Sequence, residues 1–184
     1  MPVMPQNFTP STNSILEEFN HLEREDAATA VLPCNGSSVW AALLAYNRPF
    51  ASPDDLLTIS DKIWGSLPED DWQQAFDSHP RIGEHKAKAA TEQSLKWSAT
   101  EQAKADPDAA TKAALAEGNK AYEQKFGRIF IVCASGKSAA EMLQILRKRL
   151  ANDAETELHE AAEQQRQITQ IRLRKWLQVP QEAK

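Results

Sequence analysis

The residues best suited to chemistry occupy one stretch of nine positions, Ser78-His79-Pro80-Arg81-Ile82-Gly83-Glu84-His85-Lys86. The proline and the glycine predict a fixed turn there, not the interior of a long helix. His79 directly precedes the proline, which favours an extended backbone at that position. A histidine held at a turn beside an arginine suits proton transfer near neutral pH, so we consider His79 a candidate acid–base residue.

Two other interpretations of this turn stay open. His79 could be a structural residue, since spacing alone does not separate that role from a catalytic one. A metal-dependent hydrolase could use His79, Glu84 and His85. However, the two histidines are six residues apart, which does not place them on one helix face, and no HExxH or CxxC motif accompanies them. We therefore predict no metal site.

A second polar cluster is Ser98-Ala99-Thr100-Glu101-Gln102. Serine followed three residues later by glutamate is the capping box that begins many helices. The same spacing recurs at Ser14/Glu17, Ser66/Glu69 and Ser138/Glu141. We therefore expect a helix to begin at Ser98, and the spacing alone gives Glu101 little functional weight. A ligand role remains compatible, because the free N–H groups at a helix N-terminus suit an anion.

The arginines of the chain have different expected roles. Arg48-Pro49-Phe50, which follows Trp40, is typical of a helix end with an aromatic plug. Arg172 and Arg174 lie in the last predicted helix, where a solvated position is the simplest interpretation. If Arg172 instead faces inward, it needs a carboxylate partner, because an unpaired buried charge is costly. A substrate could supply that carboxylate.

The elements that must position these residues are predicted to be helices. Ile15, Leu16, Phe19 and Leu22 recur at helical spacing, and short helical pieces bounded by turn signals follow at 26–34, 39–46, 54–64 and 70–76. Beyond the helix that begins at Ser98, further helices are expected at 106–126, ending at Gly127, at 137–151 and at about 153–178. The inner face of the last helix would carry Leu158, Ala162, Gln165, Ile168, Ile171 and Leu173.

One short run, Ile129-Phe130-Ile131-Val132-Cys133, favours β structure, but it has no partner strand, and a short buried helix fits equally well. No βαβ rhythm and no internal repeat appear. The predicted fold class is therefore all-α: a single-domain bundle of about eight to ten helices, several of them short. We expect residues 1–12, rich in proline and small polar residues, to form a mobile arm, and residues 13–180 to form the helical domain.

Composition excludes several classes of protein. The chain has 184 residues, a net charge of -5 and a pI of about 5.4, which argue against a nucleic-acid-binding surface. Its six glycines form neither GxGxxG nor a P-loop. No apolar run is long enough to span a membrane, and the start of the chain does not resemble a signal peptide. We predict a cytoplasmic protein in which Cys34 and Cys133 are reduced, with one long-range disulfide as the alternative.

Several of these motifs, taken in chain order, resemble the 2-oxo-4-hydroxy-4-carboxy-5-ureidoimidazoline (OHCU) decarboxylase family. The resemblance extends from about residue 14 to 178 and rests on Trp40…Arg48-Pro49-Phe50, Ser78-His79-Pro80-Arg81-Ile82-Gly83, Ser98-x-x-Glu101-Gln102, Ala121-Tyr122…Lys125-Phe126-Gly127 and Ile171-Arg172-Leu173. The chain departs from the family at Arg128-Ile129, where a Phe-Pro pair is usual. A changed turn and pocket wall are expected there.

The resemblance implies an all-helical homodimer that uses no cofactor. It would convert OHCU to (S)-allantoin and CO2, the last step from urate to allantoin. His79 and Glu101 would be catalytic, with His79 acting near its natural pKa as acid and base. The implied substrate-binding residues are Pro80, Ser98, Gln102, Phe130, Ile131, Val132, Cys133, Ala134 and Arg172. A helical interaction module without enzyme activity is the alternative, although it leaves the polar turn unexplained.

Overall fold

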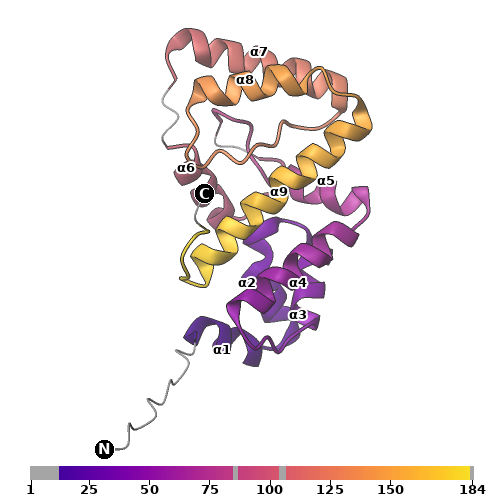
Figure 1. The fold of residues 1–184 in the computed structure, drawn as a ribbon, viewed down its shortest axis with the longest axis vertical. Coiled ribbons are helices and arrows are strands. Elements are labelled where there is room, and N and C mark those ends of the chain that lie inside the picture. Colours follow the sequence, from indigo (N-terminus) through magenta and orange to yellow (C-terminus); the bar gives the residue numbers. More distant parts are fainter. Residues whose placement is uncertain (1–12, 85–86, 104–106, 183–184) are drawn as a thin grey trace, which may run out of the picture.

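The structure is a computed structural model that describes residues 13–84, 87–103 and 107–182. Within these ranges the chain forms nine α-helices and no strand (Figure 1), which confirms the all-α prediction. In chain order the helices are α1 (Ser14–His21), α2 (Arg24–Asn35), α3 (Ser38–Tyr46), α4 (Pro53–Ser66), α5 (Glu69–Asp77), α6 (Glu92–Glu101), α7 (Ala109–Phe126), α8 (Ala139–Arg149) and α9 (Ala154–Trp176). The expected N-terminal arm, residues 1–12, lies outside the described residues.

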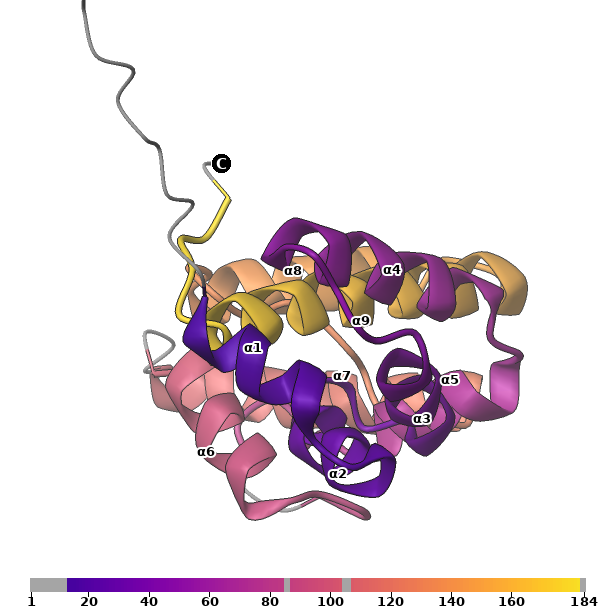
Figure 2. The same ribbon diagram turned by 90° about the horizontal axis from the view of Figure 1, so that it is seen from below.

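The last helix, α9, connects the two ends of the molecule. It runs obliquely from the stacked pair α7 and α8 down to the group formed by α1 to α4 (Figure 1). Figure 2 shows α4 lying alongside α9, where Trp64 donates a hydrogen bond of 2.9 Å from Nε1 to the carbonyl of Ala162. Of the inner face expected for this helix, Ala162, Gln165, Ile168 and Leu173 are buried, while Leu158 and Ile171 are only half-buried.

Buried apolar side chains form two clusters. The larger lies among α1 to α5 and α9 and includes Phe19, Trp40 and Trp64. The smaller lies between α7 and α8 and includes Tyr122 and Met142. A fold with two such clusters needs a segment that seals the boundary between them.

Residues 129–134 are that boundary segment, and they are neither the strand nor the helix expected from the sequence. Ile129, Ile131 and Cys133 join the larger cluster, whereas the residues between them, Phe130, Val132 and Ala134, join the smaller one. The side chains of this extended segment alternate, which in the sequence is typical of a strand. Here the alternation places them in the two apolar clusters in turn. Side chains replace the hydrogen bonds of a neighbouring strand, since Ile131 O accepts from Arg149 and Cys133 N donates to Gln164.

Helix ends confirm one predicted capping box and overturn three. Ser138 and Glu141 form the reciprocal box at the start of α8, as expected. At α1 the cap is Asn13, which accepts from Leu16 N. Ser66 is the last residue of α4, and α5 begins after Pro68 with no side-chain cap.

The third overturned box matters most, because Ser98 does not begin a helix. Helix α6 starts at Glu92, where the Thr91 side chain accepts from Ser94 N, and Ser98 and Glu101 occupy its last turns. Thr91 caps the helix earlier, so the Ser98–Glu101 spacing places both side chains on one helix face near the C-terminal end. The idea of an anion site at a helix N-terminus beginning at Ser98 is therefore wrong.

Other local predictions are confirmed. The long helix α7 ends at Gly127, whose φ of 70° is the left-handed conformation that glycine adopts readily. Arg48 lies at a helix end as predicted, since its guanidinium donates to the carbonyl of Ala45 in the last turn of α3 and to that of Leu22, which follows α1. Cys34 and Cys133 are both buried thiols and are not joined by a disulfide. None of the helices in the described ranges combines the length and apolar composition that crossing a membrane requires.

Candidate active site

The structure brings nine of the eleven sequence-predicted site residues around one small chamber. Its volume is about 20 Å3, enough for roughly one water molecule. Ile82 and Ile168 complete the wall. The predicted residues that line it are His79, Pro80, Ser98, Glu101, Gln102, Phe130, Ile131, Val132 and Ala134.

The end of α5 positions His79 at this chamber. The helix stops at Asp77, and His79 N still donates to the carbonyl of Phe76 at 3.1 Å. Gly36 supports the turn from the other side: its φ is 102°, and a Cβ there would lie 2.3 Å from Ser78 Oγ. Only glycine fits this close approach, so the end of α2 and the histidine turn are packed directly against each other.

Behind His79 lies a buried polar network that the sequence did not predict. His79 Nε2 lies 2.7 Å from Oε1 of Gln165 on α9. Gln165 Nε2 in turn donates to the carbonyl of Asn35 at 3.3 Å and to Thr169 Oγ1 at 3.2 Å. A glutamine among apolar positions on the inner face of α9 was the signal that could have indicated this role.

Burial and, to a smaller extent, the positive charge of Arg172 lower the pKa of His79 from 6.5 to about 3, although the hydrogen bond to Gln165 opposes them. His79 is only 8% exposed, so little water solvates a charged imidazole. The expectation that this residue acts near its natural pKa is therefore wrong. Its imidazole is neutral at pH 7 and can accept a proton.

Arg172 faces inward and finds its carboxylate within the protein. Its Nε lies 2.9 Å from Glu101 Oε1, and its terminal nitrogen NH2 lies 3.1 Å from Glu101 Oε2, a two-pronged pair. The arginine side chain is 1% exposed and that of Glu101 11%. The sequence anticipated such a partner, but did not indicate that Glu101 supplies it.

Two helix ends also stabilise the Arg172 charge. Arg172 NH1 donates to the carbonyl of Pro33 in the last turn of α2, and NH2 donates to Ser98 Oγ in the last turns of α6. The C-terminal end of a helix carries a partial negative charge, which favours a cation. Arg172 therefore joins α2, α6 and α9 beside the chamber, although it does not line the chamber itself.

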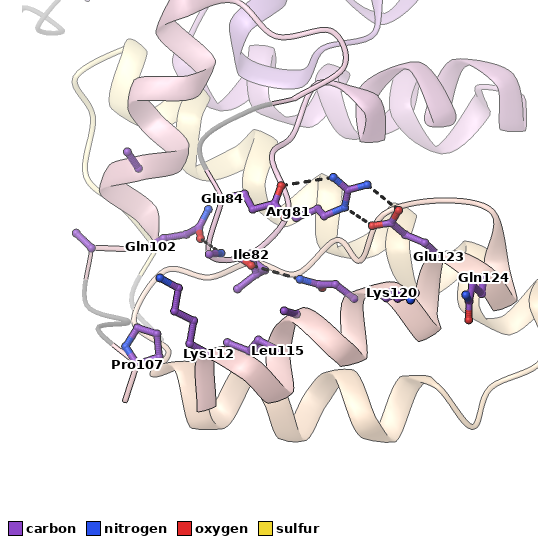
Figure 3. A pocket seen from close by; sticks show the side chains of 15 residues that line it. Arg81, Ile82, Glu84, Gln102, Pro107, Lys112, Leu115, Lys120, Glu123 and Gln124 are labelled. Atoms are coloured by element: carbon purple, nitrogen blue, oxygen red, sulfur yellow. Dashed lines mark hydrogen bonds and ion pairs between the residues drawn. The ribbon is translucent and has the colours of Figure 1, made fainter. Parts of the chain in front are cut away.

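Arg81 points away from the chamber, into a larger cleft of about 830 Å3 between α6 and α7 (Figure 3). Its guanidinium forms a two-pronged pair with Glu123 of α7 and also contacts Glu84 at 3.4 Å. The cleft and the chamber share Ile82 and Gln102 as wall residues. Arg81 thus holds the histidine turn, residues 78–84, against α7.

Gln102 closes the chamber on the side of that cleft. Its Oε1 accepts a hydrogen bond of 2.9 Å from Gly83 N (Figure 3), so the end of α6 is tied to the histidine turn. Cys133, by contrast, turns its side chain into the larger core cluster and lines a separate cavity near Lys137 and Arg166. Of the eleven predicted site residues, only Cys133 and Arg172 are not chamber-lining residues.

A metal site finds no support in the described ranges. No three His, Cys, Asp or Glu side chains are grouped there so as to hold an ion. His85, one of the three residues of the metal-hydrolase interpretation, lies outside the described residues. The other two residues diverge, because His79 lines the chamber while Glu84 lines the cleft.

Comparison with protein families gives a match over most of the chain: residues 20–174 match the family model for OHCU decarboxylase. The uric acid degradation bifunctional protein TTL of Arabidopsis thaliana is 38% identical over 144 residues, which cover 77% of this chain but 44% of that protein. The OHCU decarboxylase of Amia calva is 28% identical over 149 residues, covering 80% of this chain and 82% of that protein. The chain thus spans less than half of the Arabidopsis protein.

Solved structures share the fold. A crystal structure of OHCU decarboxylase in the presence of (S)-allantoin matches with a TM-score of 0.71 and 34% identity, covering 85% of this chain and 99% of that one. A crystal structure of (S)-allantoin synthase matches with a TM-score of 0.67, over 88% of this chain and 53% of that one. At 16% identity, the second match shows a common fold alone.

Proposed function

Since the chain belongs to the OHCU decarboxylase family, we propose that it converts 2-oxo-4-hydroxy-4-carboxy-5-ureidoimidazoline to (S)-allantoin and CO2. One observation supports this most strongly: a neutral His79 and Glu101, the carboxylate partner of Arg172, line a single chamber. This is a site for proton transfer next to a site for a polar or anionic group.

The substrate can supply its own electron sink. When the carboxylate leaves as CO2, the electron pair of the broken carbon–carbon bond moves toward the adjacent ring C=N, whose nitrogen takes up a proton. The hydroxyl-bearing carbon is then part of an enol. Loss of the hydroxyl proton and addition of a proton to the neighbouring carbon on one face give one hand of allantoin. The net change replaces CO2 with one proton.

His79 is the proposed proton carrier for the hydroxyl and the enol. Its neutral imidazole accepts the hydroxyl proton, and the resulting imidazolium can return it. A bound carboxylate near Arg172 offsets the positive charge that lowers the pKa of His79, so the substrate itself makes the imidazole more basic. The basicity that His79 needs for catalysis therefore develops only when substrate is bound.

The remaining residues are proposed to bind and orient. Glu101 accepts hydrogen bonds from ring or ureido N–H groups, and Arg172, which lies behind the chamber wall, holds a substrate oxygen once the chamber has enlarged. Ser98 and Gln102 hydrogen-bond the ureido group. Pro80 contacts the substrate, and backbone groups of residues 130–134 hydrogen-bond its amide edges. Orientation contributes much of the rate in such a site, because the substrate is already reactive.

The chamber must enlarge before substrate binds, since about 20 Å3 holds little more than one water. The wall toward the 830 Å3 cleft is the proposed access side. Gln102 contributes to that wall, and its Oε1 accepts a hydrogen bond from Gly83 N. Exchange of that bond for a bond to substrate would open the chamber and place Gln102 on the ureido group.

The assembly and location are further proposals. We propose a homodimer, which the family resemblance implies. Exposed Val39, Leu43 and Tyr46, which share one face of α3, form an apolar patch available to a second copy. Two buried thiols without a disulfide fit a reducing cytoplasm. Mass measurement in solution, for the wild type and for Leu43→Lys, tests the dimer: a monomeric wild type contradicts it.

A circular dichroism time course tests the proposed reaction. Urate is converted in place by urate oxidase and hydroxyisourate hydrolase, and the protein is then added. We expect rapid appearance of one-handed allantoin, and a loss of about 100-fold or more in His79→Asn with the fold retained. Racemic product at the spontaneous rate would contradict the proposal and favour a binding module without catalysis.

A further inference from the structure

Gln165 lies directly behind His79 and is absent from the chamber wall. We propose that Gln165 is a positioning residue: its side-chain carbonyl holds the imidazole proton on Nε2 and leaves the lone pair on Nδ1 as the proton acceptor. The inference rests on the proposed function, because it assigns a supporting residue to the histidine of that reaction. It adds which ring nitrogen of His79 accepts the proton.

The direction of the His79–Gln165 hydrogen bond follows from the network around it. Gln165 Nε2 lies 3.3 Å from the carbonyl oxygen of Asn35, which can only accept. The amide nitrogen of Gln165 must therefore face Asn35, and its Oε1 must face His79. Oε1 cannot donate, so the proton between them belongs to His79 Nε2.

The network is held in place on every side. Thr169 Oγ1 accepts from Asn35 Nδ2 at 3.0 Å and donates to the backbone carbonyl of Gln165 at 2.9 Å. Asn35 Oδ1 accepts from Ser37 N at 3.0 Å. Asn35 and Gln165 are fully buried. Turning the amide of Gln165 would place its Oε1 against the carbonyl oxygen of Asn35, acceptor against acceptor, so its orientation is strongly fixed.

An amide differs from a carboxylate in what it does to a histidine. A carboxylate on Nε2 would favour the imidazolium, whereas an amide orients the ring without adding charge. The charged groups near His79 are Arg172 from α9, whose positive charge lowers the pKa of His79, and Glu101 from α6, which is paired with Arg172. The buried thiol of Cys34, on α2, also faces Arg172 and stays uncharged because burial raises its pKa to about 12. Gln165 thus leaves His79 a neutral base.

Nitrogen NMR of the histidine side chains tests the wild-type protein directly. The chain has four histidines, and His79→Asn assigns the signal of His79. We expect a neutral imidazole with its proton on Nε2 throughout the range from pH 5 to 8. A proton on Nδ1, or an even mixture of the two forms, would overturn the proposal. This readout needs neither substrate nor activity, so it separates a failure of this inference from a failure of the proposed function.

Two substitutions at Gln165 test the role in catalysis. Gln165→Glu should raise the pKa of His79 by about 1–3 units and shift the pH profile of kcat equally. Gln167→Glu makes the same change on a half-buried position of α9 that contacts Glu163 instead, and it should leave the His79 titration unmoved. Equal titrations of His79 in Gln165→Glu and the wild type would refute the assignment.

Gln165→Met removes the hydrogen bond while keeping the length of the side chain. We expect kcat to fall about tenfold or more while KM stays nearly constant, because Gln165 lies outside the chamber wall. The tautomer signal of His79 should become mixed in the same variant. A rise in KM with unchanged kcat would identify Gln165 as a structural or binding residue and contradict the proposal.

Discussion

Two buried arginine–glutamate pairs are attached to α9, and they are built differently. At one end of the helix, Glu157 pairs with Arg149 of α8 at 2.5 Å. The same carboxylate accepts from Tyr122 Oη at 2.5 Å and from Asn152 Nδ2 at 2.9 Å. Burial and the hydrogen bond to Glu157 raise the pKa of Tyr122, so it remains a donor. Glu157 is thus fully buried, and hydrogen-bond donors from Arg149, Tyr122 and Asn152 saturate its carboxylate.

At the other end of α9, Arg172 is the only donor to Glu101 within the described part of the chain. Glu101 also borders the chamber that contains His79. A carboxylate has room for about four hydrogen bonds, so Glu101 retains acceptor capacity on the chamber side. The comparison indicates that a saturated pair holds a fold together, while an unsaturated pair next to a cavity is available to a ligand.

The largest expected effect comes from breaking the saturated pair. Arg149→Met leaves Glu157 buried and charged, and also removes the donor to the carbonyl of Ile131. We expect a loss of about 3–5 kcal/mol in the free energy of unfolding, measured by urea denaturation. Arg147→Met, at an exposed position of the same helix, should change it by less than about 0.5 kcal/mol. Similar losses of stability in the two variants would contradict a structural role for the Arg149–Glu157 pair.

The next effect concerns pH and the chamber end of α9. Because the pKa of His79 is about 3 when folded and about 6.5 when unfolded, the unfolded chain binds the additional proton between these values. This contribution to stability is complete above pH 6.5 and declines by about 1.4 kcal/mol per pH unit below it. From pH 6.5 to 5, wild-type stability should therefore fall by about 2 kcal/mol more than that of His79→Asn. Parallel curves for the two proteins would show that His79 is not the neutral base described here.

A smaller effect separates binding from stability within α6. Ser98→Ala removes one acceptor of Arg172 and one chamber-lining hydroxyl, so we expect a cost of about 1 kcal/mol in unfolding free energy together with a several-fold rise in KM. Ser94→Ala is the matched control, since this buried serine donates to the carbonyl of Thr91 away from the chamber. It should have the same cost and an unchanged KM. An equal KM for both variants would mean that Ser98 supports Arg172 without contacting substrate.

Much of the fold was predictable because helix signals are local. The capping box at Ser138 and the terminal Gly127 each act within a few residues, and the structure confirms both. The failures occur where distant parts of the chain decide. Ser98 resembles a cap in isolation, but Thr91 caps that helix about two turns earlier. The alternation of residues 129–134 is real, yet two separate cores, and not a sheet, explain it.

The candidate site shows the same division. Motif order alone gathered His79, Ser98 and Glu101, which the structure places around one chamber. Sequence could not indicate that Glu101 pairs with Arg172, because these residues meet only when α9 packs against α6. The low pKa of His79 was equally out of reach, since it arises from burial and from a charge on a distant helix.

The most direct test of the account compares Glu101→Gln with Glu157→Gln in the stereospecific allantoin assay, with each rate divided by the folded fraction of the variant. The same atom changes at each end of α9. We predict that Glu101→Gln lowers kcat/KM about 100-fold with a modest loss of stability, whereas Glu157→Gln loses stability but turns over at a near-normal rate while folded. Normal turnover in Glu101→Gln combined with loss of turnover in folded Glu157→Gln would contradict the assignment of the active site.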